Sequence, residues 1–361
     1  MGKIAIVCGS LSRGGAERVT VNLLEYLYKI GKDVMLITGA KKENEYQLSA
    51  EIKRIVLNDA VDGKLRICKM IQSMRKCLSE EKIDTVIIMG VPVCLYAVPP
   101  CIGRPVKMIV SERNDPKHFE GKTVVKILSR LLMSMAHGYV FQTQEAMDFY
   151  PSKYAAKGKI IRNPLIIESV PQRISIEKRI VTCGRLVEQK NQKLLIDAFD
   201  IVHQKYPDYK LVIYGEGPLR NRLTEYIVHK KLLEAVEMPG NVTNVLEKIV
   251  DTTVFVLSSD FEGMPNALIE AMAIGVPCIS TDCPCGGPRE LIINGQNGLL
   301  TEVGNTEQLA GAIIRMIEDE EFREDIAKVA MQVKRSLAIE CIGGQWLDLI
   351  DRVSLPGNRV K

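Results

Sequence analysis

Short apolar runs alternate along the first half of the chain with longer segments of helical period. The runs predict strands at residues 3–8, 34–38, 85–89, 107–110 and 138–142. Between the first two runs, apolar residues recur on one helical face and predict a helix over 16–30, which Gly31 ends. Strands that alternate with helices in this way are typical of a parallel sheet covered by helices.

The same alternation restarts after a polar segment at 172–178, which we interpret as a linker. Strands are predicted at 179–183, 210–214, near 236, and at 253–257, 277–281 and 298–300. Helices are predicted at 192–206, 219–233, 245–250, after Pro265, at 306–319, 321–337 and around 346–353. We therefore predict an α/β protein with two tandem, doubly wound domains, residues 1–170 and 171–337. Ligands of such sheets bind beyond the carboxyl ends of the strands, so two facing domains would form a cleft.

Composition narrows the class of protein. The chain has 361 residues, 46% of them hydrophobic and 25% charged, which excludes collagen-like and disordered chains. Residues 1–170 hold 26 Lys and Arg against 17 Asp and Glu, whereas the remainder holds 22 against 27. This asymmetry indicates an anionic partner for the first half, although chance scatter of surface charge would give the same sums. No nucleic-acid partner is predicted.

Cysteine usage and hydropathy bear on location. The ten cysteines are scattered, mostly within apolar runs, as in reduced cytosolic proteins. The apolar run at 4–8 is too short for a signal peptide. Residues 85–103 carry no charge and approach a membrane-spanning length, but three prolines interrupt them. We therefore predict a buried strand at 85–89, a turn and a short packed segment, with one membrane span at 85–103 as the alternative. The location expected from these signals is cytoplasmic.

The strongest candidate site is the segment 258–270, where a strand ends, a Gly/Pro turn follows and a helix begins near Pro265. The N–H groups and the dipole of a helix start favour an anion. On one helix of 3.6 residues per turn, Glu262 and Glu270 would be about 80° out of phase, so they need not share a face. We expect Glu262 in the loop and Glu270 on the helix, where one ligand could meet them at separate points. Carboxylates accept hydrogen bonds from sugar hydroxyls. A solvated turn residue and an ordinary helix-start glutamate are the alternative.

Other strand-to-helix turns carry further candidates. Arg185 and Lys190 follow one strand and suit a diphosphate, unless they are merely surface cations. Gly215 and Gly217 match the first two glycines of a dinucleotide-binding fingerprint, but the third glycine is missing. This pattern favours a tight turn, or a backbone that approaches a ligand closely, over an NAD site. The loop at 12–18 has two glycines but is not a Walker loop, and an Asp-x-Asp metal motif is absent from the sequence.

Taken together, these motifs resemble retaining glycosyltransferase family 4. The resemblance rests on the Glu262 and Glu270 spacing, on Gly184-Arg185-Leu186 followed by Lys190, on Gly215-x-Gly217, on Pro239-Gly240-Asn241 and on the Gly14-Gly15 loop. It runs over nearly the whole chain and is most specific at 257–300. The resemblance implies the GT-B fold of two Rossmann-like domains, with a C-terminal helix at 338–361 that packs on the N-terminal domain. Similar proteins are bacterial glycosyltransferases of surface polysaccharides and lipid-linked oligosaccharides.

The resemblance also implies roles for these residues. Arg185 and Lys190 would clamp the donor diphosphate, and Glu262 would bind sugar hydroxyls. These three are the candidate catalytic residues. Glu270 would bind the ribose. Asn241 and Val242 would flank the base. The remaining donor-binding candidates are Gly14, Gly15, Gly215, Gly217, Gly263, Met264, Pro265, Asn266, Ala267 and Leu268. No metal or other cofactor is implied.

The acceptor side departs from the family pattern. Arg113 stands where many members carry a histidine, which favours a contact from Arg113 and Asn114 to an anionic acceptor. Three basic residues at four-residue spacing share one helical face, beside apolar positions on the other: Lys122, Lys126 and Arg130. Such a basic amphipathic helix predicts a peripheral contact with a membrane, and a core-packed helix with a solvated face is the alternative.

The resulting hypothesis is a metal-independent, retaining enzyme at the inner face of the plasma membrane. It would transfer a hexosyl or N-acetylhexosaminyl residue from a UDP-sugar to a polyprenyl-diphosphate-linked saccharide in bacterial surface glycan or capsule synthesis. A nucleotide-sugar epimerase of the same fold would need acid–base groups that four scattered histidines do not favour. A non-catalytic sugar-binding module would not need Glu262, Arg185 and Lys190 together.

Overall fold

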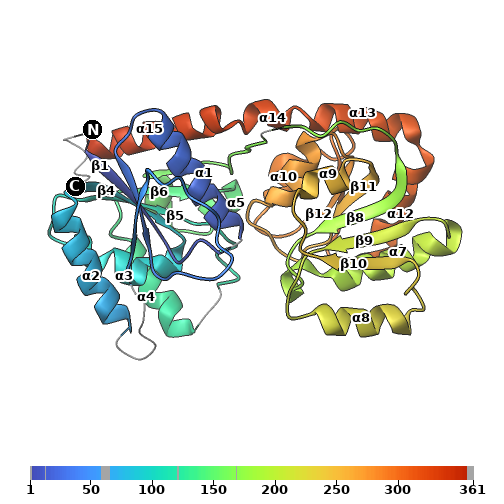
Figure 1. Ribbon diagram of the computed structural model, residues 1–361, viewed down its shortest axis with the longest axis horizontal. Helices are drawn as coiled ribbons and strands as arrows, with labels where there is room; N and C mark the ends of the chain where they lie inside the picture. The colour runs from blue at the N-terminus through green and yellow to red at the C-terminus, as the bar shows by residue number, and fades with distance from the viewer. Residues whose placement is uncertain (1, 13, 58–65, 120–121, 168, 356–361) are drawn as a thin grey trace. The chain divides into compact units, whose positions relative to one another are not determined.

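The computed structural model describes residues 2–12, 14–57, 66–119, 122–167 and 169–355. The chain divides into two compact units (Figure 1). Unit 1 comprises Met1–Ile166 and Leu337–Lys361, and unit 2 comprises Ile167–Ser336. Each unit is built around a parallel sheet with helices on both faces, as the alternation of strands and helices predicts.

Unit 1 contains a seven-stranded parallel sheet in the order β3-β2-β1-β4-β5-β6-β7. Its strands are β1 (Lys3–Cys8), β2 (Val34–Thr38), β3 (Lys53–Val56), β4 (Ile83–Met89), β5 (Lys107–Ser111), β6 (Gly138–Phe141) and β7 (Gly158–Ile160). The strand order reverses between β1 and β4, which creates a switch point where loops diverge beyond the carboxyl ends. The central strands are buried on both faces over most of their length, so their sequences are largely apolar.

Seven α-helices and two 3-10 turns of unit 1 are described around this sheet. They are α1 (Gly15–Lys29), α2 (Arg66–Glu80), η1 (Val91–Val93), α3 (Cys94–Ala97), η2 (Pro99–Cys101), α4 (Thr123–Met133), α5 (Gln144–Asp148), α6 (Ser152–Ala155) and α15 (Ile339–Ser354). The C-terminal helix α15 packs on α1, where a Cβ added to Gly343 would lie 2.2 Å from Cε1 of Tyr26. Trp346 of α15 is fully buried in this unit.

The uncharged stretch 85–103 does not form one helix. It continues β4 and then breaks into the short segments η1, α3 and η2. Gly90 precedes η1, and prolines lie within η1 and η2. The predicted strand, turn and short packed segment are therefore confirmed. In the part of the chain that the structure describes, no helix is both long enough and apolar enough to cross a bilayer.

Unit 2 contains a six-stranded parallel sheet in the order β10-β9-β8-β11-β12-β13. Its strands are β8 (Glu177–Cys183), β9 (Lys210–Tyr214), β10 (Val236–Gly240), β11 (Thr252–Leu257), β12 (Cys278–Thr281) and β13 (Leu299–Thr301). Its helices are η3 (Glu188–Lys190), α7 (Gln192–Lys205), α8 (Arg220–His229), α9 (Val245–Ile249), α10 (Asn266–Ala273), α11 (Gly287–Leu291), α12 (Thr306–Glu318), α13 (Glu320–Ala330) and α14 (Val333–Ser336). The predicted helix at 321–337 is thus two helices, α13 and α14.

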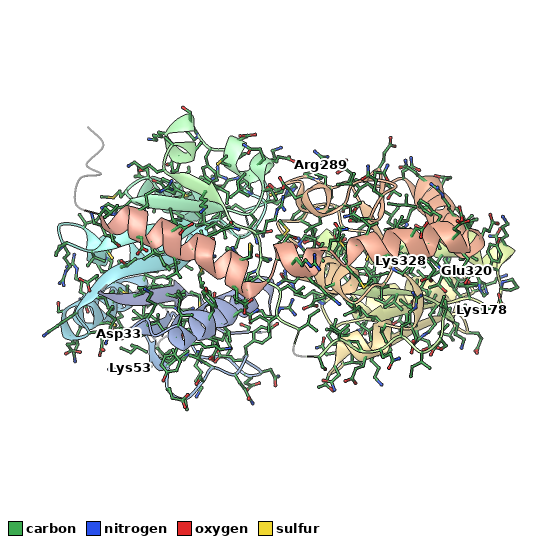
Figure 2. All side chains as sticks on the ribbon, turned by 90° about the horizontal axis from the view of Figure 1, so that it is seen from above. Asp33, Lys53, Lys178, Arg289, Glu320 and Lys328 are labelled. Atoms are coloured by element: carbon green, nitrogen blue, oxygen red, sulfur yellow. The ribbon has the colours of Figure 1, made fainter. Side chains whose placement is uncertain are left out.

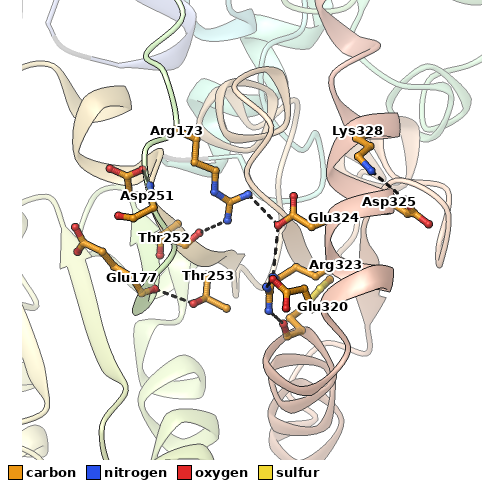
Figure 3. A network of polar contacts seen from close by, with 12 residues as sticks. Arg173, Glu177, Asp251, Thr252, Thr253, Glu320, Arg323, Glu324, Asp325 and Lys328 are labelled. Carbon is orange, nitrogen blue, oxygen red and sulfur yellow. Dashed lines mark hydrogen bonds and ion pairs between the residues drawn. The ribbon is translucent and has the colours of Figure 1, made fainter.

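The segment predicted as a linker is bound to the surface of unit 2 (Figure 3). Arg173 lies 3.4 Å from a carboxylate oxygen of Glu324 on α13 and donates a hydrogen bond to the carbonyl of Thr252 at 3.2 Å. The backbone N–H groups of residues 174 and 175 donate to Asp251. The polar residues that marked this segment as a linker therefore attach it to α13 and β11. Further along α13, Lys328 projects outward (Figure 2).

Candidate functional site

The candidate site of unit 2 lies beyond the carboxyl ends of β8 and β11. These adjacent strands flank the point where the strand order reverses, the place at which open parallel sheets bind ligands. The segment 183–191 leaves β8 and the segment 258–265 leaves β11. Side-chain hydrogen bonds join the two loops, because Ser258 Oγ donates to the carbonyls of Lys190 and Asn191 at 3.0 and 3.1 Å.

Asn191 holds the first loop in shape. Its backbone is left-handed, with φ 41°, and its side-chain oxygen accepts the N–H of Leu194 at the start of α7. Its Nδ2 donates to Asp260 at 2.7 Å. Asparagine tolerates this backbone conformation and caps helices well, so one residue both turns the chain into α7 and attaches it to the β11 loop.

Lys190 and Glu262 form the central contact of the site. Lys190 Nζ lies 2.5 Å from Glu262 Oε1, and Ser259 Oγ donates to the same oxygen at 2.6 Å. The side chain of Glu262 is buried, and that of Lys190 is largely so. A carboxylate oxygen that accepts two donors is held in one orientation. Glu262 Oε2 receives neither of these donors, so it is the oxygen that could accept a ligand hydroxyl.

Arg185 presents its side chain differently. Its carbonyl accepts a hydrogen bond from Gln192 Nε2 at 2.8 Å, whereas the side chain is exposed. Among the described residues, its guanidinium has no hydrogen-bonding or ion-pair partner. A fixed backbone with an unpaired guanidinium suits a phosphate group, which an arginine binds as a two-pronged donor.

The glycine turn after β9 packs directly on the loop after β8. Gly215 has φ 133°, and a Cβ added to it would lie 1.9 Å from the carbonyl oxygen of Gly184. A Cβ on Gly217 would lie 2.4 Å from the carbonyl oxygen of Leu186. Both glycines are therefore required by the close approach of two backbones. This packing explains the Gly-x-Gly pattern without a dinucleotide.

The loop before α10 is also packed tightly. Gly263, Met264 and Pro265 are buried, and a Cβ on Gly287 would lie 1.6 Å from the carbonyl oxygen of Gly263. Pro265 precedes the first residue of α10, and this N-cap provides no side-chain hydrogen bond within the described structure. The start of α10 is thus directed by packing and not by a capping side chain.

The other donor-binding candidates of unit 2 differ in exposure. Asn266 and Ala267 are half-buried at the start of α10, whereas Leu268 is fully buried in the core. Glu270 is half-buried on α10. Burial, with a further contribution from the charge of Glu270, raises the pKa of the Cys183 thiol at the end of β8. Asn241 is exposed directly after β10 and Val242 is half-buried.

Unit 1 holds the remaining candidates. Gly14 precedes the first residue of α1 beyond the carboxyl end of β1, and a Cβ there would lie 2.3 Å from a carboxylate oxygen of Glu17. Gly15 is the exposed first residue of α1. The structure therefore brings the catalytic candidates together within unit 2, and it assigns this glycine pair to the switch point of the other sheet.

Arg113 belongs to a polar cluster at the carboxyl ends of β5, β6 and β7. Its Nη2 donates to Asn163 Oδ1 at 2.5 Å, and Gln142 Nε2 donates to the same oxygen at 2.6 Å. Burial lowers the pKa of Arg113 to about 10, although the charge of Glu112 opposes this shift. Sequence reasoning missed Gln142 and Asn163, whose signal is a polar residue just after a short apolar strand.

Glu112 is the buried carboxylate of this cluster. It accepts hydrogen bonds from Tyr150 Oη at 2.6 Å and from the backbone N–H groups of Arg113 and Asn114 at 3.0 and 3.4 Å. Burial raises its pKa, and these donors oppose the shift. Glu112 was also missed, and its role is to hold the backbone of residues 113 and 114.

Comparisons with known proteins identify the family. The profile described as "Glycosyl transferases group 1" matches residues 168–333, which include the whole site of unit 2. An uncharacterized glycosyltransferase of Methanocaldococcus jannaschii is 30% identical over 341 residues, covering 79% of this chain and 84% of the relative. The chain belongs to the group 1 glycosyl transferases. The predicted family resemblance is confirmed.

Relatives and solved structures extend this finding. This glycosyl transferase is 29% identical over 362 residues to an α-1,4-N-acetyl-D-galactosaminyltransferase of Campylobacter jejuni. The match covers 98% of this chain and 99% of the relative, whose name specifies an undecaprenol-diphosphate-linked acceptor. Anabaena HepE in complex with UDP and glucose superposes with TM-score 0.82 at 18% identity, covering 98% and 100%. Sucrose-phosphate synthase of Thermosynechococcus elongatus gives TM-score 0.83 at 17% identity, covering 98% and 99%. The fold is GT-B, as predicted.

The glycosyl transferase differs from expectation at α4. The basic residues were expected on an outward face, but Arg130 points inward, where Nη2 donates to the carbonyl of Pro116 at 2.5 Å and the guanidinium lies 4.8 Å from the ring centroid of Phe149. Lys126 is half-buried, and only Lys122 is exposed. The apolar residues that a core-packed helix would be expected to bury, among them Val124, Ile127 and Leu131, are exposed. The outward face is apolar.

Within the described ranges, the enzyme has no group of three or more His, Cys, Asp and Glu side chains placed to hold a metal ion.

Proposed function

We propose that this glycosyl transferase moves a hexosyl or N-acetylhexosaminyl residue from a UDP-sugar to a polyprenyl-diphosphate-linked saccharide, with retention of configuration and without a metal ion. The observation that carries the proposal is the grouping of Lys190, Glu262 and the unpaired Arg185 beyond β8 and β11. Two cations suit a diphosphate, and a buried, oriented carboxylate suits sugar hydroxyls.

The donor would bind to unit 2 through complementary groups. Arg185 contacts the diphosphate, and Lys190 turns part of its hydrogen bonding from Glu262 to a phosphate oxygen. The N-terminal turn of α10 adds N–H groups and a favourable dipole. Glu270 accepts the ribose hydroxyls and Asn241 borders the base.

The reaction would proceed at the anomeric carbon of the donor sugar. The bond from this carbon to the phosphate oxygen breaks, and the acceptor oxygen forms the new bond on the same face. The departing phosphate oxygen takes the proton of the acceptor hydroxyl, so charge and protons balance. Arg185 and Lys190 stabilise the negative charge of the leaving diphosphate, and Glu262 stabilises the positive charge that develops on the sugar.

The acceptor proposal rests on relatives and on charge. Two Campylobacter jejuni relatives, 29% and 26% identical to this chain, are named for acceptors on undecaprenyl diphosphate. Residues 1–170 carry 26 basic and 17 acidic residues, which suits an anionic acceptor. Arg113, with Asn114 beside it, is the proposed contact to the acceptor. We propose that the enzyme works in bacterial surface glycan synthesis, at the inner face of the plasma membrane.

Calorimetric titration with UDP, GDP, ADP and NAD, each with and without EDTA, tests the donor. We expect micromolar binding of UDP that EDTA leaves unchanged. Turnover of a UDP-sugar panel with a short-chain polyprenyl-diphosphate saccharide then tests the acceptor, and proton NMR of the product tests the anomeric configuration. Binding of NAD without UDP, or an inverted product, would contradict the proposal.

A further inference from the structure

The outward face of α4 is a continuous apolar stripe. Val124 is 66% exposed, Ile127 61%, Leu128 45% and Leu131 64%, and Met135 just beyond the helix is 44% exposed. Spacings of three, four, seven and eleven residues place them on one side of the helix. We call these five residues the α4 stripe. Contiguous aliphatic side chains in solvent are uncommon on a soluble surface and indicate a binding face.

The orientation of α4 is held by its inner face. Ser129 and Met133 are fully buried, and α4 packs against η1 and α3. Arg130 is held by the carbonyl of Pro116 and by the ring of Phe149. Rolling the stripe inward would break these contacts and expose Met133, so the stripe remains in solvent unless another surface covers it.

Charge distinguishes between possible partners. The stretch 121–144 contains no Asp or Glu, whereas Lys122, Lys126 and Arg130 lie within it. Lys117, just before it, is half-exposed and lies 3.4 Å from Glu145. An apolar stripe bordered by lysines is complementary to an anionic bilayer, where the aliphatic side chains enter the acyl boundary and the ammonium groups meet phosphates. Two copies of α4 in contact would bring only basic groups together.

We propose that the α4 stripe inserts into the interface of an anionic bilayer and that the aliphatic side chains, more than the basic ones, hold the enzyme there. The inference rests on the proposed function in that a lipid-linked acceptor requires the enzyme at a membrane. Residues 112–122 run from the end of β5, past Arg113, to the start of α4. Arg130 of α4 donates to the carbonyl of Pro116, three residues after Arg113, so docking through α4 would hold the segment that carries the proposed acceptor contact at the membrane.

Vesicle co-sedimentation of the full chain tests the proposal. The probes are phosphatidylcholine vesicles with and without 30% phosphatidylglycerol. We expect binding to the anionic vesicles, and at least a tenfold weaker partition for Ile127→Ser/Leu131→Ser, which leaves every charge in place. The matched control is Val228→Ser/Leu233→Ser, two apolar residues of unit 2 that are 53% and 58% exposed. Wild-type binding by the α4 variant would overturn the inference.

A spectroscopic variant tests insertion directly. The chain has one tryptophan, Trp346, which is fully buried, so Leu131→Trp adds a reporter on a constant background. We expect a blue shift with anionic vesicles and quenching by brominated acyl chains. If lipid leaves the emission of Leu131→Trp unchanged, the proposal is overturned. It is also overturned if light scattering shows that the wild type dimerises, the α4 serine variant does not, and neither protein binds vesicles.

Two assays separate this inference from the proposed function. Transfer to a water-soluble, short-chain acceptor should be equal in the α4 serine variant and the wild type, whereas transfer to a long-chain acceptor in vesicles should fall at least tenfold. Vesicle binding without any transfer to either acceptor would contradict the proposed function alone. Equal transfer in vesicles by both proteins would contradict the docking inference alone.

Discussion

Lys190 Nζ lies 2.5 Å from Glu262 Oε1, across 72 positions of sequence. The contact joins the loops that follow β8 and β11, the two strands at the switch point of unit 2. Because both side chains are largely buried, removal of either charge leaves the other without compensation. The pair therefore links the stability of unit 2 to its chemistry.

Removing the two cations should weaken UDP binding in different ways. Arg185→Ala should raise the Kd at least tenfold with no change in Tm, because a charge-assisted hydrogen bond is worth about 1.5–3 kcal/mol and the side chain is exposed. Lys190→Ala should weaken binding similarly and also destabilise unit 2 by about 1–3 kcal/mol, less than a fully buried pair would lose. Calorimetry and thermal melts measure both effects.

The control for the cation variants is Lys328→Ala, which removes an exposed positive charge on α13 (Figure 2). It should leave UDP affinity and Tm at wild-type values. If Arg185→Ala and Lys190→Ala bind UDP as the control does, the diphosphate assignment fails.

Glu262→Gln should impair transfer and spare UDP binding. The amide keeps the shape of the carboxylate and can still accept a hydrogen bond from Ser259. It removes the negative charge that we propose stabilises the sugar. Loss of one such electrostatic group costs about 10²–10³ in kcat. Steady-state kinetics with the UDP-sugar substrate gives kcat, and calorimetry gives the Kd for UDP. Undiminished kcat would rule out a role for Glu262 at the sugar.

Gly287→Ala should disturb the loop before α10. The new Cβ would lie 1.6 Å from the carbonyl oxygen of Gly263, so one backbone must move. We expect a loss of several °C in Tm and weaker UDP binding. Gly311→Ala is the matched control, because nothing lies within 4 Å of its Cβ and it is inside α12. That variant should gain about 0.5–1 kcal/mol; equal behaviour of both variants would contradict the packing argument.

Thiol reactivity should separate the cysteines into two classes. Cys68 and Cys341 are exposed, whereas burial raises the pKa of Cys8 to about 12 and that of Cys77 to about 11. Since the thiolate is the reactive form, alkylation of the native protein at pH 8 should label Cys68 and Cys341 rapidly. Mass spectrometry should find all ten labelled only in denaturant. Rapid native labelling of Cys8 would refute the burial.

Glu112 should make stability depend on pH. Burial raises its pKa above the ordinary value of 4.5, so the folded state binds this proton more tightly than the unfolded state. The contribution of Glu112 to the free energy of unfolding is therefore fully present below pH 4.5. It is lost as the pH rises through the pKa that Glu112 has in the folded state. Between pH 4.5 and this folded-state pKa, the free energy of unfolding of the wild type should therefore fall relative to that of Glu112→Gln. Urea unfolding at several pH values measures it, and parallel curves would exclude the effect.

The central strands and the chemistry-bearing turns could be predicted because their signals are local. Periodicity identified β1, β2 and β9 at their observed bounds. The motif residues from 257 to 300 identified the family. The short strand β3 was missed because it is a half-exposed edge strand with two basic residues, and β7 because it has only three residues.

By itself, then, the sequence determined the two α/β domains, the family and the loops that carry the site, since these follow from local patterns of residues. Only the tertiary structure decided that Lys190 pairs with Glu262, that Gln142 and Asn163 surround Arg113, and that α4 turns its apolar face outward. Periodicity defines the two faces of a helix equally well whichever one is buried. Which face turns inward depends on the elements packed against it, and these come from distant parts of the chain.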